Sequence, residues 1–153
     1  SDELLEGWNT NRRINLWLIE GVSEQGLRCS LSTRGGRDVA RQFAHVHNNR
    51  LHHLDKRAPD LAEGLENFES KHSPSREQLI VAYEASTAAM GVFLVDVLGG
   101  SPNEGIKKGI FTTLSYMIAH EAHHRGSILL TLKHSAGNAG KTVTYSIWDW
   151  DRR

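Results

Sequence analysis

Four long segments with helical spacing of apolar residues constrain the fold of this chain more than any other feature. They cover residues 8–22, about 38–57, about 74–98 and about 112–134, and glycine- or proline-containing stretches separate them. Each apolar stripe must be buried against another element, and no pair of strand-like segments competes with this arrangement. The sequence therefore predicts an all-α fold, a four-helix bundle formed by one domain over residues 1–153.

Several residues predict where these helices begin and end. Asp38 lies in or near the first turn of the second helix, where the helix dipole favours a carboxylate, and Ala58-Pro59 ends that helix. Ser73 followed by proline predicts an N-cap for the third helix. Thr112 is the residue we expect to cap the fourth.

The remaining segments predict less regular structure. Residues 59–73 are polar and suit a short helix or a packed loop. Residues 143–150 alternate like a strand, but a lone strand has no partner, so we expect an extended C-terminal tail packed on the bundle through Ile147, Trp148 and Trp150. All four tryptophans are expected to serve as core or interface anchors: Trp8, Trp17, Trp148 and Trp150.

Composition limits the partners, the location and the metal ligands that we expect for this chain. Lys and Arg number 18, as do Asp and Glu, so charge gives no reason to expect a nucleic-acid or acidic-membrane partner. No uninterrupted apolar run approaches about 18 residues, and no N-terminal targeting pattern is visible, so we expect a cytoplasmic protein. Cys29 is the single cysteine, which excludes an intrachain disulfide and a multi-thiolate zinc site. A metal site in this chain would need histidine and carboxylate ligands.

The histidines are concentrated in two places. Seven of the nine lie in the windows 45–53 and 120–124, on the predicted second and fourth helices. His124 follows His120 by four positions, an i, i+4 spacing that places both imidazoles on one helix face and offers two nitrogens to one metal ion. We therefore expect the second and fourth helices to be neighbours that share a metal site.

The residues alone leave the third ligand open. His47 lies near the middle of the apolar face of the second helix, whereas His45 lies off its edge, so a buried-face argument favours His47. A ligand at the mouth of a bundle need not lie at that centre, and His45 stays a candidate. Three neutral imidazoles with one open position describe a catalytic site for zinc, nickel, copper or iron.

Glu121 completes the pattern His-Glu-x-x-His, in which a zinc peptidase uses the glutamate as general base. The surrounding sequence does not support a peptidase. Ser127 and Leu130 stand where the metzincin extension needs glycine and histidine, and no glutamate follows Glu121, which leaves Asp149 and Asp151 as the only downstream carboxylates. We expect Glu121 to face solvent or to orient a histidine.

Arg50 and Arg125 are the other polar candidates. Either could be a surface cation, which is the more common role of arginine. If they line the site, their paired donors could receive a carboxylate or a thiol-bearing substrate. With Glu121 they form the set of candidate catalytic residues.

Two segments resemble the DinB/YfiT-like superfamily of metal-binding four-helix bundles. Val39-Ala-Arg-Gln-Phe-Ala-His-Val is similar to the second-helix pattern of that family, and His120-Glu-Ala-His-His-Arg-Gly-Ser-Ile is similar to its His-x-x-x-His-Arg-Gly-Gln-Ile signature. The resemblance implies a metal held by His45, His120 and His124, and so selects His45 over His47. Ser127 departs from the glutamine usual in the family.

The resemblance also implies a range of functions. Family members with known activities use the metal to lower the pKa of a thiol or of water, so we expect a metal-dependent thiol transferase or hydrolase acting on a small molecule. Zinc or nickel is the expected ion, with iron or manganese as alternatives, and a low-molecular-weight thiol is an expected cofactor. A homodimer is expected too. The alternatives are a non-catalytic, metal-binding, stress-response dimer and, less favoured, the peptidase.

Overall fold

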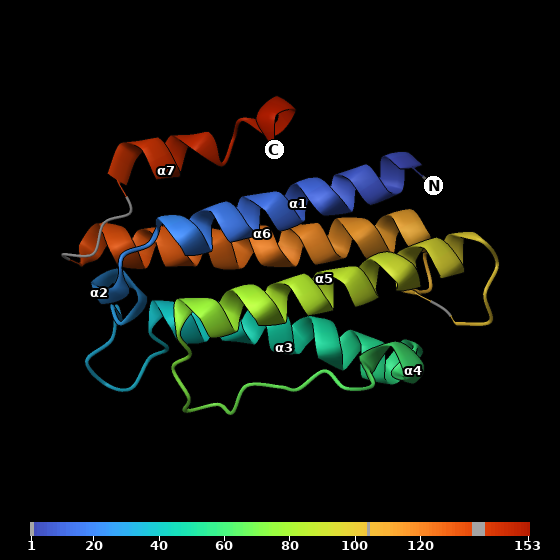
Figure 1. Ribbon diagram of the computed structural model, residues 1–153, viewed down its shortest axis with the longest axis horizontal. Coiled ribbons are helices and arrows are strands. Elements are labelled where there is room, and N and C mark those ends of the chain that lie inside the picture. The colour runs from blue at the N-terminus through green and yellow to red at the C-terminus, as the bar shows by residue number, and fades with distance from the viewer. Residues whose placement is uncertain (1, 104, 136–139) are drawn as a thin grey trace.

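A computed structural model describes residues 2–103, 105–135 and 140–153, and the regular elements of these residues are helical. Four long helices lie side by side: α1 (Asp2–Gly21), α3 (Val39–Arg57), α5 (Arg76–Leu98) and α6 (Ile110–His134), as Figure 1 shows. The predicted all-α bundle is confirmed, and its four helices correspond to the four apolar segments of the sequence.

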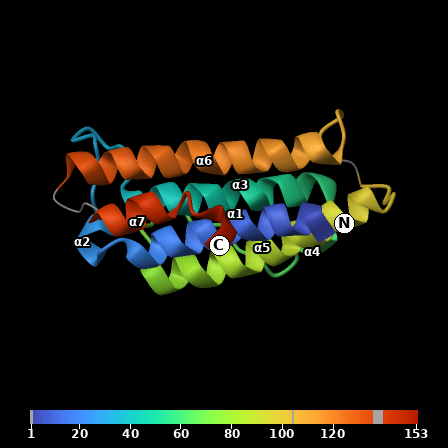
Figure 2. The same ribbon diagram turned by 90° about the horizontal axis from the view of Figure 1, so that it is seen from above.

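The order of the helices around the bundle brings the two histidine-rich helices together. α5 and α6 each pack against both α1 and α3 (Figure 2). After α4 (Pro59–Ala62), a long connection runs back along the bundle, so that α3 and α5 point the same way and α1 and α6 point the other way (Figure 1). Contact between α3 and α6 confirms the predicted neighbours.

The starts of α3 and α5 follow from N-capping. Asp38 caps α3 as expected, since its carboxylate accepts a hydrogen bond of 2.8 Å from the Arg41 amide. Ser75, not Ser73, caps α5, and with Gln78 it forms a capping box. The Ser73 hydroxyl instead donates to Asp38 at 2.7 Å and so ties the start of α5 to the start of α3.

α6 begins two residues before the predicted cap. Its N-cap position is Gly109, whose φ of 99° is accessible to glycine, and Thr112 lies inside the helix. Thr113 holds the preceding loop, because its hydroxyl accepts a hydrogen bond of 2.8 Å from the Ile106 amide. The expectation that Thr112 caps the helix was wrong. The side chain that accepts a hydrogen bond from a backbone amide of the preceding loop is that of Thr113, which lies inside the first turn.

The C-terminal tail is helical where an extended segment was expected. It contains α7 (Gly140–Ser146), which lies along α1, and a 3-10 turn, Trp150–Arg152 (Figure 1). A helix satisfies backbone groups that a lone strand would leave unpaired. Ile147 is buried, as expected, but Trp148 is 76% exposed and Trp150 is 44% exposed, so these two tryptophans are not core anchors.

α5 has the length and apolar composition of a membrane-spanning helix, and it is the one such candidate among the described residues. The central helix of a bundle has the same composition, and α5 packs against α1 and α3. Its buried face carries Leu79, Tyr83 and Met90. The cytoplasmic location therefore stays a prediction.

The interior of the bundle is divided into three layers along its length. One apolar cluster includes Leu18, Phe43 and Ile128, and a second includes Trp8, Leu54 and Met117. Between them every long helix contributes buried polar side chains: Asn11 and Asn15 from α1, Arg50 from α3, Ser86 and Thr87 from α5, and Glu121 and Arg125 from α6. This polar layer lies beside the helix faces that carry the candidate metal ligands.

Candidate metal centre

Three histidines from two helices converge at the surface of the bundle. His45 of α3 joins His120 and His124 of α6, and one ring nitrogen of each lies within 4.8 Å of the others. Among the described residues no further His, Cys, Asp or Glu joins this group. The ring centroid of His45 lies 4.7 Å from that of His124 and 5.8 Å from that of His120. The arrangement could hold one metal ion with a coordination position left for another molecule.

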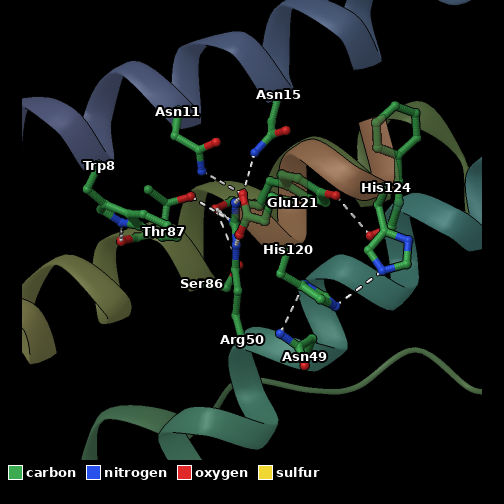
Figure 3. Close-up of polar contacts among 12 residues, drawn as sticks. Trp8, Asn11, Asn15, Asn49, Arg50, Ser86, Thr87, His120, Glu121 and His124 are labelled. Carbon is green, nitrogen blue, oxygen red and sulfur yellow. Dashed lines mark hydrogen bonds and ion pairs between the residues drawn. The ribbon is translucent and has the colours of Figure 1, made fainter. Parts of the chain in front are cut away.

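The spacing of the α6 pair suits a metal ion. His120 Nε2 and His124 Nε2 are 3.2 Å apart (Figure 3). Two nitrogens of a tetrahedral zinc site, with bonds of about 2.0–2.1 Å, lie about 3.3 Å apart. On the other side of its ring, His120 Nδ1 is 3.3 Å from the Asn49 amide of α3. Metal binding through Nε2 needs the proton on Nδ1, so Asn49 would support it with its side-chain oxygen, not its nitrogen, turned toward Nδ1–H.

The surroundings keep the three rings in the neutral form that binds metals. Partial burial, followed by the positive charge of Arg37 and the proximity of His120, lowers the pKa of His45. Burial likewise lowers the pKa of His120. For His124, burial and then the neighbouring histidines lower the pKa to about 4. Neutral imidazoles therefore face one another near pH 7.

The rival ligand His47 lies elsewhere. It is 1% exposed, its Nε2 lies 2.9 Å from the carbonyl oxygen of Glu66, and its ring packs on Phe68 with centroids 5.4 Å apart. His47 is buried, as its place on the apolar face of the second helix predicted, but it packs against the α4–α5 connection and not against α6. His45, selected by the family resemblance, is the residue that faces α6.

Glu121 points into the polar layer of the bundle, one helix face away from the three imidazoles. It is 1% exposed, and its carboxylate accepts hydrogen bonds from Arg50 Nε at 2.7 Å and Arg50 Nη2 at 2.9 Å (Figure 3). Asn11 and Asn15 donate to the same carboxylate at 2.6 and 2.7 Å. Glu121 was expected to face solvent or to orient a histidine. The first alternative was wrong, because the i+1 position on α6 turns Glu121 toward α1 and α3. The hydrogen bonds of its carboxylate given above go to Arg50, Asn11 and Asn15 and not to a histidine.

Arg50 and Arg125 are not surface cations either. Arg50 is fully buried between the rings of Trp8 and Tyr83, with its guanidinium carbon 5.2 and 4.6 Å from their centroids. Arg125 donates to the side-chain oxygens of Asn11 and Asn15 at 2.8 and 2.9 Å. Both arginines therefore stabilise the polar layer through buried hydrogen bonds.

Sequence reasoning missed the asparagines that complete this layer. Asn11 and Asn15 each donate to Glu121 and accept from Arg125, so each bridges the two charged groups of α6. Their i, i+4 spacing was the available signal, because it places both on the helix face that also carries the apolar residues Trp8 and Leu18. Asp149, one of the two remaining carboxylate candidates, pairs instead with Arg152 at 3.2 Å.

The fold and the site together define a class: an all-α bundle with a three-histidine candidate metal centre between two neighbouring helices. The model of the DinB family matches residues 1–150, and the chain belongs to this family. Comparisons with curated proteins and with solved structures give no significant match.

Proposed function

We propose that this DinB-family protein is a metal-dependent enzyme, a thiol transferase or hydrolase that acts on a small molecule. His45, His120 and His124 are the proposed ligands of a divalent ion, zinc or nickel. A bound divalent ion of this kind lowers the pKa of a thiol or a water molecule that occupies its open position. The observation that carries the proposal is the convergence of three imidazoles at one point.

The residues around the ligands support this role. Asn49 orients the ring of His120, and the 3.2 Å separation of His120 and His124 requires little rearrangement on metal binding. Each ligand is only partly buried, which leaves the open position accessible to a small molecule. The proposed low-molecular-weight thiol, the small-molecule substrate and the homodimer belong to the same proposal.

The buried contacts of Glu121 argue against the peptidase alternative. A general base must reach the water that attacks the substrate at the metal. Both carboxylate oxygens of Glu121 instead accept hydrogen bonds inside the bundle. A non-catalytic metal-binding bundle stays the second candidate, because it would use the same three histidines.

Metal content tests the site directly. His124→Ala is expected to lose stoichiometric zinc uptake, measured by elemental analysis after loading and dialysis, while circular dichroism shows a retained helical fold. His134→Ala, an exposed histidine at the end of the same helix, is the control and should bind zinc like the parent protein. Unchanged zinc content in His124→Ala would refute the assignment.

A second pair of variants distinguishes the ligand from its rival. His45→Ala should lose zinc, whereas His47→Ala should keep zinc and lose stability, since His47 is buried against the α4–α5 connection. If zinc binding is established, a screen of thiols with electrophilic acceptors separates the enzyme from the non-catalytic bundle. Turnover that depends on both zinc and His45 supports the enzyme, and the absence of turnover supports the second candidate.

A further inference from the structure

A pocket of about 280 Å³ opens beside His124, one of the three candidate ligands. It is lined by the loop that precedes α3, by Gln42 of α3, and by α6 residues that include His124. Because His124 also belongs to the candidate metal centre, a molecule in this pocket would lie next to the ion. The volume corresponds to about nine liquid water molecules, which suits a small metabolite and not a peptide chain.

The charged residues of this pocket favour an anion. Arg37 lines it, and none of its lining residues is acidic. Within the described part of the chain, Arg37 forms no ion pair with a carboxylate. Arg37 and His124 line the same pocket, so this charge lies beside the candidate metal centre. An unpaired guanidinium beside a small polar pocket is a recognition group for a carboxylate.

Gln42 adds a buried acceptor that lacks a donor. Its side chain lines the pocket and the residue is 9% exposed. Its Nε2 donates to Thr131 Oγ1 at 3.2 Å, and Thr131 in turn donates to the Ser127 carbonyl at 2.8 Å, which fixes the direction of the amide. Gln42 Oε1 is buried and has no hydrogen-bond partner among the described residues. An acceptor of this kind is costly to leave unpaired, and a small shift of the Gln42 amide toward the pocket would let a ligand N–H or O–H satisfy it.

We propose that this pocket binds a small carboxylate that also carries an N–H or O–H donor, with Arg37 receiving the carboxylate and Gln42 Oε1 accepting the donor. The proposal rests on the proposed function, because it describes the molecule whose reacting group would occupy the open metal position. It narrows the substrate or thiol cofactor to an anionic class and assigns specificity to Arg37 and Gln42.

Three related thiols test these two contacts on the zinc-loaded protein by isothermal titration calorimetry. N-acetyl-L-cysteine carries thiol, carboxylate and amide N–H. N-acetylcysteamine lacks the carboxylate, and 3-mercaptopropionate lacks the amide. N-acetyl-L-cysteine is expected to bind roughly three- to tenfold more tightly than N-acetylcysteamine, a modest ratio because Arg37 is exposed to solvent.

The variants assign each ratio to a residue. Arg37→Gln should abolish the preference for the carboxylate, whereas Arg34→Gln should retain it, since Arg34 is exposed in the same loop but does not line the pocket. The parent protein should also bind N-acetyl-L-cysteine more tightly than 3-mercaptopropionate, which lacks the amide. Gln42→Met should abolish this second preference, with the fold of the variant checked by circular dichroism. Equal ratios in the parent protein, Arg37→Gln and Arg34→Gln would overturn the proposal.

A cobalt-loaded sample separates failure of this inference from failure of the proposed function. A thiolate-to-cobalt absorption band with all three thiols, but without an Arg37-dependent ratio, overturns the inference and leaves the metal–thiol function standing. Conversely, Arg37-dependent binding of N-acetylglycine without any thiolate band supports the carboxylate pocket and overturns the proposed thiol chemistry.

Discussion

Removal of the Glu121 carboxylate is expected to destabilise the whole bundle. Glu121 and Arg50 are 1% and 0% exposed, and two hydrogen bonds of 2.7 and 2.9 Å join them. Burial alone would raise the pKa of Glu121, but the adjacent guanidinium of Arg50 and the asparagine donors hold that pKa below its ordinary value. The carboxylate is therefore ionised in the fold and compensates the buried charge of Arg50.

The magnitude follows from what Glu121→Ala leaves behind. Breaking a buried ion pair costs about 3–5 kcal/mol, because the remaining charge is uncompensated. The amides of Asn11 and Asn15 also lose their acceptor, at about 1 kcal/mol each where the effects are independent. We expect a total loss of about 5–7 kcal/mol, a large part of the roughly 5–15 kcal/mol that stabilises a domain.

Urea unfolding followed by circular dichroism measures this loss. The matched control is the double variant Glu121→Leu with Arg50→Met, which removes both charges and keeps apolar volume in the layer. Replacing a buried pair by apolar residues of similar volume is often neutral, so the double variant should be more stable than Glu121→Ala. That order would assign the loss to the unpaired arginine and not to the missing side-chain volume.

A third variant, Glu121→Gln, helps to decide whether Glu121 of the His-Glu-x-x-His motif has a structural or a catalytic role. Glu121→Gln should retain zinc binding, because the imidazoles lie on another face of α6. A free energy of unfolding of Glu121→Ala that lies within about 1 kcal/mol of the parent value, as for an exposed residue, would refute the structural role of the carboxylate. If the parent protein cleaves a peptide substrate, and a stable Glu121→Gln variant binds zinc but does not cleave it, the peptidase alternative would be restored.

Two further predictions concern pH and helix capping. Burial, followed by the charges of Arg57 and other neighbours, lowers the pKa of His53 to about 4, so the unfolded chain takes up a proton below pH 6.5 that the folded protein rejects until about pH 4. In excess chelator, His53→Gln should therefore lose about 1 kcal/mol less stability than the parent protein between pH 7 and 4, and equal losses in urea titrations would contradict this. Ser75→Ala should lower the free energy of unfolding by about 1 kcal/mol, because Ser75 caps α5. Thr112→Ala, which changes a residue that caps no helix, is the control, and an equal effect of both variants would contradict the assignment.

Much of the secondary structure and part of the site could be predicted from local patterns. The four apolar segments became the four long helices, and Asp38 caps α3 as expected. The pairing of His120 with His124 follows from the helix repeat alone, since residues four apart share a face. Clustering of histidines on two segments also predicted that α3 and α6 are neighbours, which the contacts confirm.

Local sequence patterns could not predict which neighbouring element each helix face contacts. His45 and His47 differ by two residues on one helix, and the position of α6 and of the α4–α5 connection determines which one approaches the histidine pair and which one contacts Glu66. Likewise, Glu121 belongs to a peptidase motif by spacing, but the partners of its carboxylate come from α1 and α3.

The sequence by itself therefore determined the helices and the residues that share a helix face, because the 3.6-residue repeat is a property of neighbours along the chain. Only the tertiary structure decided that a pocket lined by Arg37 and Gln42 lies beside His124, and that Glu121 and both arginines lie in the polar layer. These contacts depend on the rotation and relative shift of whole helices, which the combined packing of their buried faces determines.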